Sequence, residues 1–294
     1  MQGLITVFWK ELADHFTSKR FIILFLIVFA VGIFSIYIDA QYIREAVTET
    51  RFVFLQLYTT SGQALPLFIF FIAFFMPIVG ITLSFDAINS ERSNGTMSRL
   101  LSQPIYRDSV INGKFLAGVV TIAIMLTSMV MLVAGVGLRM IGVPPSSEEI
   151  ARLIAFLIIS VVYGAFWLGL GMLFSIFFRR VATSALASIA IWLLCIALFA
   201  FPFFVQLGEQ LAFAIMRISP ITVLWQVITI LLVPSARPLG QILETGREAV
   251  PTSALALYQS LIIVWPYLIS LVVLTAICFA ISYIRFMREE IRST

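Results

Sequence analysis

Long apolar runs alternate with short polar segments along nearly the whole chain. A helix needs about 20 mostly apolar residues to cross the hydrocarbon core of a membrane, whereas the strands of a membrane barrel alternate over about 10 residues. The runs here are continuous. They predict an all-α membrane protein with six transmembrane helices, at residues 21–38, 65–85, 115–138, 153–178, 181–205 and 261–284.

The composition supports the same class. Of the 294 residues, 61% are hydrophobic and 12% are charged, and the mean hydropathy is +1.06. A soluble domain has about 45–50% apolar and about 25% charged residues. We therefore expect residues 1–294 to form a single membrane domain.

The distribution of Lys and Arg predicts the orientation, because basic residues near span ends stay in the cytoplasm. Twelve of them lie on the side that holds residues 1–20, 86–114, 179–180 and 285–294, and seven lie on the other side. Both termini are therefore expected in the cytoplasm, with the protein in the cell (plasma or inner) membrane. This rule explains the net charge of +4 without a nucleic-acid partner.

Residues 1–20 predict an amphipathic helix. An apolar face with aromatic residues is typical of a helix that lies among the lipid headgroups, at the membrane interface. An ordinary cytoplasmic helix packed on the membrane domain is the alternative. The apolar face consists of Ile5, Phe8, Trp9, Leu12 and Phe16.

The second predicted span contains Pro77 and Gly80. A proline inside a helix removes a backbone hydrogen bond and kinks the helix, which membrane helices tolerate when neighbours satisfy the freed carbonyl. The two residues are candidates for the hinge of a gate, and static packing is the alternative.

A long external segment, residues 206–258, precedes the sixth span. It contains the apolar piece 221–233, which follows Ser219-Pro220, a helix-start signal, and ends before Pro234. The piece is too short to span a membrane but long enough to enter from the outer side and return. We expect a re-entrant helical lid, with a helix lying flat on the outer surface as the alternative.

The chain offers little for catalysis or ion coupling. It has one histidine, His15, and its spans contain almost no ionisable residue, so zinc sites, proteolytic aspartate pairs and proton relays are not indicated. No G-x-x-x-x-G-K-[ST] loop occurs. We expect no enzyme activity, metal or cofactor in this chain, and any energy for transport must come through another polypeptide.

Residues 86–114, between the second and third spans, are called the coupling segment below. Asp86–Asn94 can extend the second span as a helix, and Gly95 is the expected break. Thr96 is a suitable N-cap for a second short helix, Met97–Ser102. This cytoplasmic helix would lie across the ends of the spans.

Pro104 ends the short helix, and Asp108 can cap the helix that continues into the third span. Met97, Leu100 and Leu101 give the short helix an apolar stripe. The stripe either packs on the cytoplasmic ends of the spans or fits a groove in a soluble partner.

The coupling segment, followed by Gly113-Lys114-Phe115, resembles that of permease subunits of type-2 ATP-binding cassette transporters, and Trp9–Leu12 looks like their opening helix. Many members have an acidic residue where Ser98 stands, so the charge presented to a partner differs here. Around Asp86 and Gly113 the likeness extends to the permease of the nitrous oxide reductase maturation system, although the same segments occur in exporters of drugs, lipids, peptides and sodium.

The resemblance implies a dimer with a second permease copy, identical or different, and two copies of a separate cytosolic ATPase that binds ATP and Mg²⁺. It also implies that the N-terminal helix and the coupling segment contact this ATPase. The residues that would form or position the contact are Glu91, Arg92, Gly95, Thr96, Leu100, Leu101, Pro104 and Arg107.

The function expected from this resemblance is ATP-driven export of an amphiphilic or apolar substrate. The alternative is a membrane module that does not transport, and instead transmits ATPase motion to an extracytoplasmic accessory protein such as a metalloenzyme maturation factor. Residues 206–258 would bind that accessory protein.

Overall fold

The computed structural model describes residues 2–46, 54–59, 67–96, 105–142, 144–200, 219–232 and 256–288. Within these ranges the regular elements are helices, and six of them are long and apolar enough to cross a membrane. The prediction of an all-α membrane protein with six spans is therefore confirmed. The candidate spans are Lys19–Tyr37, Phe68–Ser93, Arg107–Met140, Ser147–Phe177, Val181–Phe199 and Leu257–Arg288.

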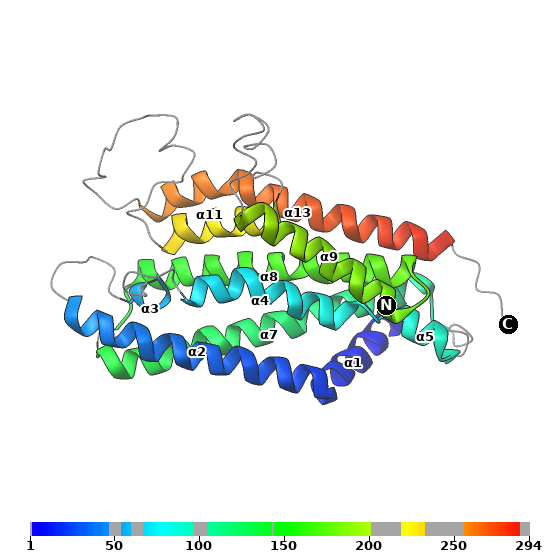
Figure 1. The fold of residues 1–294 in the computed structure, drawn as a ribbon, viewed down its shortest axis with the longest axis horizontal. Helices are drawn as coiled ribbons and strands as arrows, with labels where there is room; N and C mark the ends of the chain where they lie inside the picture. Colours follow the sequence, from blue (N-terminus) through cyan, green and yellow to red (C-terminus); the bar gives the residue numbers. More distant parts are fainter. Residues whose placement is uncertain are drawn as a thin grey trace.

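The helices form an elongated bundle, with the long helices side by side along its longest axis (Figure 1). One end holds α1 and α5 and is called the α1/α5 end; the opposite end holds α3 and is called the α3 end. The helices are α1 (Gln2–Thr17), α2 (Lys19–Ala46), α3 (Gln56–Thr59), α4 (Leu67–Ser84), α5 (Asn89–Ser93), α7 (Arg107–Ile141), α8 (Ser147–Phe177), α9 (Val181–Ala200), α11 (Pro220–Leu232) and α13 (Leu257–Arg288).

Helix α8 lies at the centre of the bundle. It packs against α4, α7, α9, α11 and α13, and its side chains Phe156, Tyr163 and Trp167 are fully buried. In contrast, α2, α9 and α13 expose large apolar side chains, such as Leu186 and Ile262. A helix that is apolar on all sides and exposes one of them is typical of a membrane, where that side faces lipid or another membrane subunit.

Helix α11 begins at Pro220, directly after Ser219, as the helix-start signal predicts. Its side chains Ile221, Leu224 and Ile228 are fully buried against α8, α13 and their neighbours. The helix therefore lies inside the bundle rather than on its surface. Re-entry from the outer side stays a prediction, because most of residues 206–258 lie outside the described residues.

The chain leaves the α4 helix for one turn before α5 begins. Residues 85–88 form this turn, where the sequence favours an uninterrupted helix as far as Asn94. A contact with α8 interrupts the helix here. The backbone N–H groups of Ile88 and Asn89 donate to the hydroxyl oxygen of Ser175 in α8, at 2.9 and 3.2 Å. These two backbone N–H groups therefore bond to a neighbouring helix, whereas in a straight helix they would donate to carbonyl groups of the same helix.

A buried carboxylate organises the α3 end. Glu149 closes a capping box with Ser146 at the start of α8. Its other oxygen accepts from the backbone N–H groups of Phe54 and Leu55, at 2.9 and 3.3 Å. One side chain therefore caps a helix and fixes the segment that leads into α3.

A buried guanidinium lies one turn further along the same helix. Arg152 is fully buried and donates to the carbonyl of Leu231, in the last turn of α11, at 2.9 Å. It also donates to Ser260 of α13 and pairs with Glu148. A cation favours the carbonyl end of a helix, so Arg152 holds α11 in place on α8 and α13.

Replacing Glu149 by alanine should destabilise the fold. The change leaves two buried N–H groups without an acceptor, at about 1–3 kcal/mol each, so we expect a loss of about 2 kcal/mol or more in the free energy of unfolding. Denaturation of the purified chain in detergent measures this. Ser147→Ala, an exposed change in the same turn, is the control, and an equal effect of both variants would contradict the assignment.

Candidate functional site

Three segments that are far apart in the sequence meet at the α1/α5 end. They are α1, the first turns of α7, and α5. Helix α1 lies along α7, where Val7 packs directly against Gly113 and a larger residue at that position would collide with it. The two motifs at the N-terminus and around Gly113 are therefore neighbours in space.

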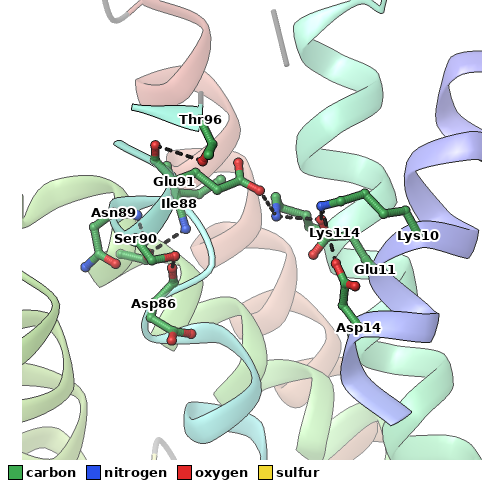
Figure 2. A network of polar contacts seen from close by, with 11 residues as sticks. Lys10, Glu11, Asp14, Asp86, Ile88, Asn89, Ser90, Glu91, Thr96 and Lys114 are labelled. Carbon is green, nitrogen blue, oxygen red and sulfur yellow. Dashed lines mark hydrogen bonds and ion pairs between the residues drawn. The ribbon is translucent and has the colours of Figure 1, made fainter. Parts of the chain in front are cut away.

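Lys114 of α7 joins all three segments. Its ammonium group lies 2.8 Å from a carboxylate oxygen of Glu11, on α1, and 2.8 Å from one of Glu91, on α5. Figure 2 shows Lys114 between these two carboxylates. The Lys114 side chain is only 4% exposed, so the pairs are largely shielded from water. We call Glu11, Lys114 and Glu91 the charged triad.

Three further ion pairs surround the charged triad. Lys10 lies 3.0 Å from Glu11 and 3.3 Å from Asp14, on the exposed side of α1. Arg20, at the start of α2, pairs with Asp86, in the turn before α5. Because these pairs are more exposed than the triad, each contributes little to stability, but the pair of Arg20 with Asp86 connects α2 to the coupling segment.

A cavity of about 200 Å³ opens between these elements. Charged groups from α1, α7 and the coupling segment line it together with residues of α4 and α8. The lining residues are Lys10, Glu11, Asp14, His15, Leu83, Ser84, Asp86, Ala87, Ser90, Glu91, Lys114, Leu168 and Met172.

The environment shifts the pKa of two groups on α1. Burial alone would raise the pKa of Glu11, but the charge and hydrogen bond of Lys114, with those of Lys10, lower it below its ordinary value of 4.5. Burial lowers the pKa of His15 below 6.5, although the charge of Glu11 acts in the opposite direction. At neutral pH Glu11 is therefore charged and His15 is neutral.

The coupling segment is also attached to α8. Arg92 donates to the carbonyl of Ile176 at 3.2 Å, and Ser175 accepts the backbone N–H groups at the start of α5. Gly95 follows the end of α5 with φ of +68°, a left-handed conformation that glycine adopts without strain. The break predicted at Gly95 thus occurs, and Thr96 folds back to donate to the carbonyl of Glu91.

The predicted short helix, Met97–Ser102, lies outside the described residues, together with the predicted coupling residues Leu100, Leu101 and Pro104. Arg107 is the first residue of α7. Asp108 does not occupy the N-cap as the sequence predicts, because the cap position is Tyr106 and the Asp108 carboxylate accepts from the N–H of Ser109.

The apolar side chains of α1 fall on two sides of the helix. Leu12 is buried and Phe8 is half-buried, whereas Trp9 is 62% exposed and Phe16 is also exposed. One side therefore packs on the bundle, and the exposed aromatic residues are available to lipid. The interfacial role of the helix stays a prediction.

Of the two predicted hinge residues, Gly80 lies in close contact with α8. A methyl group at this position would lie 2.9 Å from the carbonyl oxygen of Gly164 and equally close to Trp167. Close approach of two backbones is what small residues permit in membrane bundles. Gly80 therefore serves packing in this conformation, and a hinge at Pro77 stays a prediction.

Sequence reasoning did not select Glu11 or Lys114 as site residues. Glu11 belongs to the segment Trp9–Leu12 and Lys114 to Gly113-Lys114-Phe115, both of which carry the family resemblance. The available signal was that the first of these motifs contains an acidic residue, Glu11, beside Lys10, and the second contains a basic one, Lys114. Ser175 gives no signal in the sequence, since serine is also a common packing residue in membrane helices.

A family model described as "ABC-2 family transporter protein" matches residues 5–291, nearly the whole chain. The match includes most of α1, the coupling segment and all six candidate spans. No curated protein matches the chain in sequence.

Replacing Lys114 by methionine should destabilise the bundle strongly. Removing one partner of a buried ion pair leaves an uncompensated charge and costs about 3 kcal/mol or more, and here Glu91 loses its ion pair while Glu11 keeps only the more exposed Lys10. Denaturation in detergent measures the loss. Lys10→Met is the matched control, because Lys10 is 50% exposed and its loss should cost about 1 kcal/mol or less. Equal costs would show that Lys114 is not effectively buried.

Mild acid should weaken the fold through His15, which is the only histidine in the chain. The unfolded chain binds a proton at about pH 6.5, whereas the folded state, with its lowered pKa, resists protonation. The stability that the neutral His15 contributes is therefore fully present above pH 6.5 and is lost as the pH decreases from there. His15→Gln should reduce the loss measured between about pH 7.5 and about pH 5.5. An unchanged pH profile would contradict this assignment.

Proposed function

The chain belongs to the ABC-2 transporter family, and from this membership we propose that it is the transmembrane subunit of an ATP-driven transporter whose ATP hydrolysis takes place in a separate cytosolic subunit. That partner would hold ATP and Mg²⁺. A second permease copy, identical or different, would complete the membrane part.

The observation that carries the proposal is the charged triad. Glu91 lies in the coupling segment, Glu11 in the N-terminal helix and Lys114 at the start of α7. These are the elements that the family resemblance assigns to the ATPase contact. Because one buried ammonium group holds both carboxylates, a displacement of any one element moves the other two.

The same contacts give the movement a route into the bundle. Lys114 is part of α7, which runs the length of the bundle, and α5 is bonded to Ser175 and Ile176 near the end of α8. A push from the ATPase on the coupling segment would therefore reach α7 and α8 together, and rigid helices would carry it along the bundle. In this proposal Glu91, Arg92, Gly95, Thr96 and Arg107 form the described part of the coupling contact.

Export of an amphiphilic or apolar substrate is the finer part of the proposal. Helices α4 and α9 contain no Asp, Glu, Lys or Arg. Phe74 of α4 and Phe199 of α9 are in edge contact, and Phe199 also contacts Trp225 of α11. Such surfaces favour contact with apolar groups, and burying a charged group against them is costly.

Substitutions in the coupling segment should separate the ATPase from the permease. Gly95→Ala forces a side chain into a left-handed conformation, which costs about 1 kcal/mol, and should disturb the contact without changing the membrane fold. Glu91→Gln should weaken the charged triad. Co-purification with the partner ATPase, and the ATPase rate of the complex, measure the effect.

Gly142 provides a matched control, because it is also left-handed, with φ of +76°, but terminates α7 at the α3 end. Gly142→Ala should leave coupling intact. Normal co-purification and normal ATP-driven activity in both Glu91→Gln and Gly95→Ala would overturn the coupling role.

An intact complex that responds to no apolar substrate, and whose segment 206–258 binds an extracytoplasmic protein, would favour the non-transporting alternative.

A further inference from the structure

Helix α4 contains a proline, and α8 replaces the hydrogen bond that the proline removes. Pro77 has no backbone N–H, so the carbonyl of Ala73, four residues earlier, lacks its helical donor. The phenolic hydroxyl of Tyr163 donates to this carbonyl at 2.6 Å. Both residues are fully buried, so water cannot supply the missing donor.

The local packing keeps the Tyr163 hydroxyl within reach. Helices α4 and α8 run in the same direction (Figure 1), and long side chains on a helix point toward its N-terminus. Tyr163 therefore points back along α8 toward Ala73, while the next residue, Gly164, meets Gly80. This close approach of Gly164 and Gly80 fixes α4 and α8 relative to each other.

A second proline shows that such compensation is not automatic. Pro266 lies inside α13, and the carbonyl that it frees belongs to Ile262. That carbonyl receives no side-chain donor within the described part of the chain. Ile262 is 66% exposed, so α13 is not enclosed there as α4 is. Within the described residues, a neighbouring side chain therefore replaces the lost hydrogen bond at Pro77 and not at Pro266.

We propose that Tyr163 is a positioning residue for transport, because its hydrogen bond to Ala73 holds α4 at Pro77 in one conformation for as long as α8 keeps its place beside α4. Pro77 acts as a hinge only when this bond is broken. The conformation of α4 is therefore controlled by the position of α8. The role in transport rests on the proposed function; the hydrogen bond and its effect on α4 do not.

Spin labels on either side of Pro77 test the proposal on the full chain in lipid nanodiscs. Phe70, 38% exposed, and Ser93, also exposed, are changed to cysteine for labelling in a background with Cys195→Ala and Cys278→Ala. The parent should give a single narrow distribution of distances between the labels. Tyr163→Phe, which removes only the hydroxyl, should broaden it or add a second population.

Tyr58→Phe is the matched control. Tyr58 is also fully buried and donates to a backbone carbonyl, that of Val130, at 3.1 Å. Val130 lies in α7, which contains no proline, so its carbonyl keeps its helical donor. The distance distribution should therefore match that of the parent. An unchanged distribution in Tyr163→Phe, or equal broadening in both variants, would overturn the proposal.

A rescue experiment separates positioning from general loosening. Pro77→Ala restores a backbone N–H that can donate to Ala73. The double variant Tyr163→Phe with Pro77→Ala should therefore recover the narrow distribution. Persistent broadening would show that the Ala73 carbonyl is not the cause, and would overturn the proposal.

The two proposals fail in different measurements. The label distances are measured without the ATPase, so an unaffected Tyr163→Phe variant would overturn the positioning role and leave the coupling role of Glu91 intact. Conversely, normal co-purification and activity in Glu91→Gln and Gly95→Ala would overturn the coupling role, and the label distances would still stand.

Discussion

A polar group buried in an apolar bundle must find its partner on a neighbouring helix, because no water is present to provide one. Helix α8 provides many of these partners. Ser175 accepts two backbone N–H groups from the start of α5, Tyr163 donates to the carbonyl freed by Pro77, and Arg152 donates to the last turn of α11. Helix α8 thus fixes α5, α11 and the proline site of α4.

The buried charged groups of the triad also need partners on neighbouring helices, and a buried charge without a partner costs more than an uncharged polar group. A buried ion pair adds little net stability compared with apolar packing, since desolvation of the charges offsets their attraction. What it gives is specificity, because α1, α5 and α7 fit together only when Lys114 meets both carboxylates. The exposed pairs around it, such as Arg20 with Asp86, can form and break at little cost. Strong attachment is therefore confined to the centre of the site.

Local signals in the sequence were sufficient for most of the fold. Hydrophobic run length located the six spans, the Ser219-Pro220 pair located the start of α11, and Gly95 marked the end of α5. Where a long-range partner intervened, the local signals failed. Ser175 holds the N–H groups of Ile88 and Asn89 and so interrupts a helix that the sequence favours. Glu11 and Lys114 are 103 residues apart, and no local pattern predicts that they meet.

The contacts between α4 and α8 are distributed along both helices. Tyr163 meets Ala73, Gly164 meets Gly80, and Gly171 meets Ser84, so the residue numbers rise together on the two helices. A slide of one helix along the other would put all three contacts out of register at the same moment. The two helices therefore resist small displacements along each other and move only by a full step from one packed register to another. In a membrane transporter, a displacement at one end of this helix pair that is smaller than a full step would therefore not be transmitted to the other end.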